Sequence, residues 1–302
     1  MPTKCDFEED AFQQLVDGAI GRLTRIVTTP GRVTENVLGY DAAFFLPVDH
    51  FAAALGPHIA PHALSSPTGN PLSVGITVDP AVWGSLTTIN PAKIPPFRLN
   101  LFVQYKSPEL LRGHNAAQWP SWLSPYYRFS MTPHQLAIMN KIDQFGPSAL
   151  GCYCAPDFVD AQTLWKVTEA GNILDRAHFV RAQKLVSHGC YTYRTAKGTG
   201  VGFSEPEQIE PEDFSKMLLR AIADGRDMSL EEAILTASET ILEVTDGRAA
   251  RRGRLGTMLS NRLPGGRDGS STEDPQRRRM REALRVIRAF EIAYRSRVLI
   301  VG

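Results

Sequence analysis

The stretch Leu99-Asn-Leu-Phe-Val-Gln-Tyr-Lys-Ser-Pro108 joins an apolar run to a polar end. Its Leu, Phe and Val residues predict a short buried strand, which Ser107-Pro108 ends because proline cannot donate to a sheet ladder. Side chains alternate across a strand, so Gln104 and Lys106 are expected on one face. A buried lysine costs free energy unless it is paired or takes part in chemistry. The pattern therefore indicates a functional group at the end of this strand.

A second stretch, Thr34-Glu-Asn-Val-Leu-Gly-Tyr-Asp-Ala-Ala-Phe-Phe-Leu46, places an acid at the start of another strand. Asp41 begins the apolar run, and Glu35 lies upstream of it. An Asp at the mouth of one strand and a Gln-x-Lys on a neighbouring strand can surround a hard divalent cation with oxygen ligands. Lys106 would then lie beside a metal-bound water.

Together these stretches resemble the PD-(D/E)XK nuclease superfamily, the restriction-endonuclease-like fold, in the variant where Gln replaces the second acid. The resemblance covers about residues 7–154 and implies an α/β protein with a mixed central sheet flanked by helices. It implies that Asp41, Gln104 and Glu35 hold Mg²⁺ or Mn²⁺. Lys106 would orient the attacking water or stabilise the transition state. The alternative for the Gln-x-Lys motif is a solvated strand end without chemistry.

The first helix is predicted from Asp6 to Leu23, because apolar residues recur every four positions along it. Acidic residues occupy its first turn, where the helix dipole favours them. Some members of the resembled superfamily take a metal-binding glutamate from the helix before the catalytic strands. Glu8 and Glu9 are the candidates for that role, and the alternative is that both are surface acids.

An irregular stretch rich in Trp, Tyr, Phe and Arg is expected between Lys106 and Ser130. Such residues stack on bases and grip a sugar-phosphate chain, so the candidates for nucleic-acid contact here are Arg112, Trp119 and Arg128. The alternative is that the aromatics pack the loop against the core. Thr132-Pro133 predicts the start of a helix that runs to Phe145. His134 in its first turn is a further candidate for phosphate contact or a solvated residue at the helix start.

A core strand is predicted from Ala149 to Pro156, which completes an α-β-β-β-α-β order. Cys152 and Cys154 share one face of it, and with His188 and Cys190 they form a candidate zinc set. Structural zinc sites usually have two residues between paired cysteines, so buried reduced cysteines are the preferred interpretation.

The chain is predicted to contain two regions. Residues 1–210 form the nuclease-like domain, with a Pro- and Gly-rich insertion at about 48–98. Residues 211–302 form a mostly helical extension, with helices at 212–223, 229–244 and 276–297 and a mobile linker at 247–275. The extension is basic. Its candidates for phosphate binding are Arg251, Arg252, Arg277 and Arg278, and the alternative is a solvated basic helix.

Composition sets the remaining limits. A chain of 302 residues with 43% hydrophobic content can bury a core. Its net charge of +1 does not by itself indicate that it binds nucleic acid. No apolar run is long enough to span a membrane, and residues 1–10 lack the apolar region of a secretory signal. Four cysteines do not make a disulfide framework in a chain this long. We therefore expect a cytoplasmic protein with no membrane partner.

The sequence as a whole predicts a metal-dependent endonuclease that hydrolyses phosphodiester bonds, in DNA rather than RNA. The same resemblance implies a restriction or antiviral defence nuclease. It also implies that the chain binds a sensor or activating protein and forms a homo-oligomer. The alternative is a non-catalytic nucleic-acid-binding or scaffold protein on a nuclease-like fold.

Overall fold

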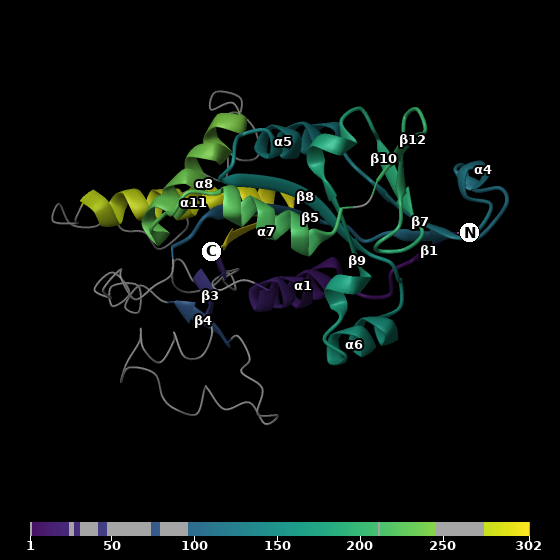
Figure 1. Ribbon diagram of the computed structural model, residues 1–302, viewed down its shortest axis with the longest axis horizontal. Helices are drawn as coiled ribbons and strands as arrows, with labels where there is room; N and C mark the ends of the chain where they lie inside the picture. The colour runs from purple at the N-terminus through teal and green to yellow at the C-terminus, as the bar shows by residue number, and fades with distance from the viewer. Residues whose placement is uncertain are drawn as a thin grey trace. The chain divides into compact units, whose positions relative to one another are not determined.

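The computed structural model describes residues 2–23, 27–30, 42–46, 74–78, 96–210, 212–245 and 275–301 of the chain. For the strands at 27–30, 42–46 and 74–78 only the backbone is described. Figure 1 shows a mixed α/β protein with two β-sheets and several helices. The expected α/β class is therefore confirmed.

The chain divides into two compact units. Unit 1 contains residues 1–20, 102–146 and 150–221, and unit 2 contains residues 21–101, 147–149 and 222–302. The expected boundary at residue 210 lies near the end of unit 1, whereas residues 21–101 group with the C-terminal residues. Most of the expected insertion at 48–98 and of the linker at 247–275 lies outside the described residues, so both stay predictions.

One sheet has seven strands in the order β4-β3-β2-β13-β5-β8-β9. The strands are β2 (Val27–Pro30), β3 (Ala42–Leu46), β4 (Val74–Val78), β5 (Leu99–Tyr105), β8 (Ala149–Pro156), β9 (Ala177–Arg181) and β13 (Arg297–Val301). β2, β3 and β4 form an antiparallel meander, and β13 pairs antiparallel with β2. β8 pairs antiparallel with β9.

Strand β5 forms where the sequence predicts it, and all of its side chains are buried. Asn100 N donates to Ser148 O and Lys106 N donates to Cys154 O, each at 2.9 Å. In both bonds the acceptor residue lies the same number of positions after the donor residue. This constant offset is the pattern of parallel strands. β5 and β8 are therefore parallel neighbours, and β8 has the bounds that the sequence predicts.

Strand β13 replaces the end of a predicted helix. The sequence predicts helix to residue 297, but α11 (Pro275–Tyr294) ends earlier and the chain turns at Arg295, whose φ is 51°. The Glu291 carboxylate supports the turn by accepting a hydrogen bond from Val298 N at 3.1 Å. Residues 298–301 are then fully buried. Their short apolar run fits a helix end or a buried strand equally well, and only the pairing with β2 decides between them.

The second sheet has six antiparallel strands in the order β1-β6-β7-β10-β11-β12. They are β1 (Thr3–Lys4), β6 (Glu109–Leu111), β7 (Tyr126–Ser130), β10 (Cys190–Tyr193), β11 (Gly200–Phe203) and β12 (Glu207–Ile209). The prediction of an irregular stretch up to Ser130 is wrong, because β6, β7 and the short helix α4 (Trp119–Trp122) form there. β7 pairs with β6, which lies close to it in sequence, and with β10, a remote partner that no local pattern reveals.

Three helices begin with a side-chain cap, and Thr132 and Ser229 lie where the sequence predicts a helix start. Thr132 Oγ1 accepts from Gln135 N at 3.3 Å, Asp160 accepts from Thr163 N at 2.7 Å, and Ser229 starts a capping box. The remaining bounds are α1 (Glu9–Leu23), α5 (Pro133–Asp143), α6 (Ala161–Glu169), η4 (Ile173–Arg176), η5 (Ala182–Leu185), α7 (Phe214–Asp224) and α8 (Leu230–Val244). Within unit 2, α8 and α11 pack side by side (Figure 1).

Candidate functional site

Gln104 and Lys106 lie at the carboxyl end of β5, together with two residues from other elements. The Lys106 Nζ donates a hydrogen bond to Gln135 Oε1 at 3.3 Å and lies 5.8 Å from the centre of the Tyr153 ring. Gln104 is buried and Lys106 is half-buried. We call Gln104, Lys106, Gln135 and Tyr153 the Lys106 cluster.

The register of the two parallel strands explains why three of these side chains meet. The bond from Lys106 N to Cys154 O sets Gln104 opposite Tyr153, so both side chains point to the same face as Lys106. Tyr105 points to the other face, where its hydroxyl donates to the Asp17 carboxylate on α1 at 2.5 Å. The predicted alternation of Gln104 and Lys106 against Tyr105 is therefore confirmed.

The site has positive electrostatic character. Gln135 belongs to the first turn of α5, where the helix dipole places partial positive charge. The Lys106 ammonium adds a full charge beside this turn. Ligands of open α/β sheets commonly bind beyond the carboxyl ends of parallel strands, which is where Lys106 lies. The arrangement is suited to an anion.

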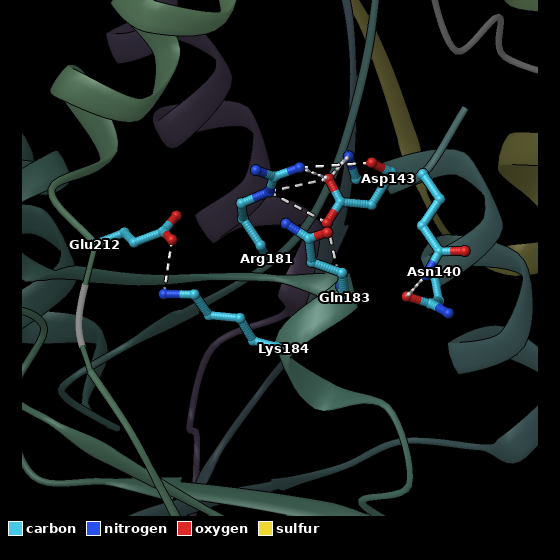
Figure 2. Close-up of polar contacts among 8 residues, drawn as sticks. Asn140, Asp143, Arg181, Gln183, Lys184 and Glu212 are labelled. Carbon is cyan, nitrogen blue, oxygen red and sulfur yellow. Dashed lines mark hydrogen bonds and ion pairs between the residues drawn. The ribbon is translucent and has the colours of Figure 1, made fainter. Parts of the chain in front are cut away.

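The last turn of α5 is anchored to the sheet by a buried ion pair (Figure 2). The Asp143 side chain is fully buried and accepts hydrogen bonds from Arg181 Nη2 at 2.8 Å, Gly151 N at 3.2 Å and Gln183 N at 3.1 Å. A Cβ atom at Gly151 would lie only 2.6 Å from the Met139 carbonyl oxygen of α5. The close approach and the ion pair fix the helix that carries Gln135.

The described residues do not complete a metal site. They include no group of three His, Cys, Asp or Glu side chains placed to hold an ion. Glu8 is exposed and Glu9 half-buried on α1, and neither belongs to such a group. Asp41 and Glu35 lie outside the described residues. We therefore derive no chemical step through a metal ion.

The strand order also corrects one expectation about the metal site. β3 begins directly after Asp41, and the sequence predicts that this strand neighbours β5. In the sheet, β2 and β13 lie between β3 and β5. The predicted adjacency is wrong because the unpredicted strand β13 occupies the place beside β5. The strand that follows Asp41 is therefore not the neighbour of the strand that carries Gln104.

The predicted nucleic-acid contacts are scattered, and most of those described already have partners within the chain. Arg128 pairs with Glu109 at 3.0 Å, and Trp119 packs against the His114 ring at 4.8 Å. Arg278 pairs with Glu282 at 3.2 Å. Arg128 and Trp119 therefore have partners outside the Lys106 cluster. Arg112 and His134 are exposed, while Arg251, Arg252 and the side chain of Arg277 lie outside the described residues.

The cysteines do not form the candidate zinc set. Cys152 and Cys154 are fully buried free thiols, and burial raises the pKa of both. Among the described residues, which include His188 and Cys190, no zinc-binding group is present. His188 instead has its Nε2 3.2 Å from a Glu207 carboxylate oxygen. The zinc interpretation is therefore wrong, and the preferred one, buried reduced cysteines, is confirmed for Cys152 and Cys154.

Tyr153 is the site residue that sequence reasoning missed. It lies between two buried cysteines in a strand that is otherwise apolar, so its ring predicts core packing. The only signal was a phenol hydroxyl in a fully buried strand beside the strand that carries Lys106. Without the register of β5 against β8, that signal does not point to the site.

The fold and this site define an α/β protein with a cationic cluster at the end of a buried parallel strand. Comparison with protein-family models, with curated proteins and with solved structures found no match for the chain. Among the described helices, none is long and apolar enough to cross a membrane.

Proposed function

We propose that this protein hydrolyses phosphodiester bonds in nucleic acid, with DNA as the preferred substrate, and that the Lys106 cluster binds the scissile phosphate. The observation that carries the proposal is the position of the Lys106 ammonium at the carboxyl end of β5, bonded to the first turn of α5. A lysine and a helix start together favour a phosphate oxyanion.

The roles of the residues follow from this position. Lys106 stabilises negative charge that builds on the phosphate in the transition state, where a preorganised cation is most effective. Gln135 orients the lysine through the bond to its Nζ. Gln104 presents a buried amide on the same face and helps to fix the phosphate.

A divalent ion, Mg²⁺ or Mn²⁺, remains part of the proposal through the resemblance to PD-(D/E)XK nucleases. When bound, such an ion would activate water and neutralise charge on the phosphate. The resemblance assigns Asp41, Glu35 and the Gln104 amide oxygen as its ligands, although β2 and β13 separate β3, which follows Asp41, from β5.

The restriction-endonuclease-like fold is likewise a proposal. It is supported by helix α1, which precedes the strands of the seven-stranded sheet, and by the parallel neighbours β5 and β8, whose connection includes α5. Strand β13 beside β5 is a departure from the expected order. From the same resemblance we also propose a role in antiviral defence, a sensor or activating partner and a homo-oligomer.

The proposal is tested by incubating the purified wild type, Lys106→Ala and Asp41→Ala with supercoiled plasmid DNA in Mg²⁺, Mn²⁺ or EDTA. We expect cleavage by the wild type that EDTA and both substitutions abolish, with unchanged melting temperatures. Salt-dependent DNA binding without cleavage under any metal would instead support the non-catalytic binding protein. Metal-dependent cleavage that survives in Lys106→Ala would remove the Lys106 cluster from the proposal.

A further inference from the structure

The Tyr153 hydroxyl is a buried polar group that lacks a hydrogen-bond partner among the described residues. A buried donor without a partner costs free energy, because it has lost water and gained nothing in exchange. Such groups in native proteins call for an explanation, and a ligand that supplies the partner is one.

Other buried tyrosines of unit 1 are satisfied. The Tyr105 hydroxyl donates to Asp17, and the Tyr193 hydroxyl donates to Pro156 O at 2.6 Å. The Tyr191 hydroxyl lies 2.9 Å from His178 Nε2. Tyr153 therefore differs from tyrosines in the same aromatic core, and the difference coincides with its place beside Lys106.

The surroundings of Tyr153 combine an apolar wall with a cation. Phe129 stacks on its ring, with 6.0 Å between ring centres and 21° between ring planes. The Lys106 Nζ lies over the same ring. Burial raises the pKa of the Tyr153 hydroxyl, so the group stays a neutral donor at physiological pH.

We propose that the Tyr153 hydroxyl binds a non-bridging phosphate oxygen of the ligand that Lys106 and the first turn of α5 attract. This inference rests on the proposed function for the choice of a phosphate ligand. Tyr153 is then a phosphate-binding residue of the cluster and not only a core side chain.

In this proposal, the anion reaches the hydroxyl when the Lys106 side chain moves. The Tyr153 side chain is fully buried, and the half-buried Lys106 side chain lies over its ring. A lysine stem has several rotatable bonds, so its ammonium can move with an incoming anion and uncover the ring edge. The same movement keeps the cation and the phosphate together.

The test uses Tyr153→Phe, which removes the hydroxyl and keeps the ring that packs against Phe129. Inorganic phosphate is titrated into the full chain at constant ionic strength and followed by NMR, and the melting temperature is measured on the same samples. We expect a loss of phosphate affinity of about tenfold, the size of a hydrogen bond to a charged group. The melting temperature should stay equal or rise, because no bond within the chain is lost.

The matched control is Tyr193→Phe, which removes a hydroxyl that is bonded within the chain. We expect it to lower the melting temperature and to leave phosphate affinity unchanged. Wild-type phosphate affinity in Tyr153→Phe, or no phosphate binding by the wild type, would overturn the inference. Phosphate binding that depends on Tyr153, in a protein that cleaves no nucleic acid, would support it while the proposed hydrolysis fails.

Discussion

Lys106 shows how far a single residue can be predicted from its neighbours in sequence. The apolar run before it predicts a buried strand, and the two-residue alternation predicts that Gln104 shares its face. Both predictions are confirmed by the burial and register of β5. The contacts with Gln135 and Tyr153 were not predictable, because they depend on how β8 and α5 pack against β5.

His178 gives a prediction at the same scale, on stability and pH. Its ring is buried, stacks on Tyr193 with 4.4 Å between ring centres and contacts the Tyr191 hydroxyl. Burial lowers the pKa of His178 from 6.5 to about 4. In the unfolded chain, His178 is therefore protonated below pH 6.5. In the folded chain it stays neutral down to about pH 4.

We accordingly expect the free energy of unfolding to be highest above pH 6.5 and to fall as the pH is lowered toward 4. The loss attributable to this histidine is on the order of 3 kcal/mol. Urea unfolding across this range should show a smaller pH slope in His178→Phe. A change at the exposed His114, such as His114→Gln, should keep the wild-type slope. An unchanged slope in His178→Phe would show that other groups cause the pH dependence.

At the scale of elements, two glycines predict opposite responses to the same substitution. A Cβ at Gly151 of β8 would meet the Met139 carbonyl oxygen of α5 at 2.6 Å. Gly18 lies within α1, and nothing is within 4 Å of its added Cβ. Gly151→Ala must push α5 and β8 apart. Gly18→Ala replaces glycine with a better helix former and creates no close contact.

We expect Gly151→Ala to lower the free energy of unfolding by about 1–3 kcal/mol and Gly18→Ala to raise it by about 0.5–1 kcal/mol. Denaturant unfolding of both variants checks the two signs. The Gly151 substitution should also weaken cleavage, because α5 carries Gln135. Equal stability of Gly151→Ala and the wild type would show that α5 is not held by close contact with β8.

Elements with local signals were predicted well, and elements that depend on remote partners were not. Thr132, Asp160 and Ser229 mark helix starts by their side-chain bonds to the backbone, and the sequence predicts the starts at Thr132 and Ser229. Strands β7 and β13 have no such signal. β13 pairs with β2, and β7 pairs with β10 as well as with the nearer β6, so remote partners complete both strands.

At the scale of the whole chain, strand order was the least predictable feature. The α/β class follows from the alternation of strand and helix patterns and is confirmed. The sheet order places β13, from the C-terminal end of the described residues, between β2 and β5. No local pattern encodes such an order, so the expected neighbourhood of the Asp41 strand and the Gln-x-Lys strand was a prediction from resemblance alone.

Two basic residues of the C-terminal region have partners that the sequence does not predict. The basic C-terminal region predicts phosphate binding, but in the described part of the chain Arg278 and Arg279 pair with Glu282 and Glu239. All four side chains are exposed, so these pairs contribute little to stability. Lys106, by contrast, is half-buried on unit 1 and bonded to Gln135 of α5.

The central claim, that the Lys106 cluster is the reactive site, is tested most directly by single-turnover cleavage of a labelled DNA duplex. Lys106→Ala is compared with Lys184→Ala, which removes a lysine paired with Glu212 at 2.6 Å (Figure 2). The account predicts a rate at least about 100-fold below wild type for Lys106→Ala, with an unchanged melting temperature, and a wild-type rate for Lys184→Ala. Wild-type cleavage by a folded Lys106→Ala protein would contradict it.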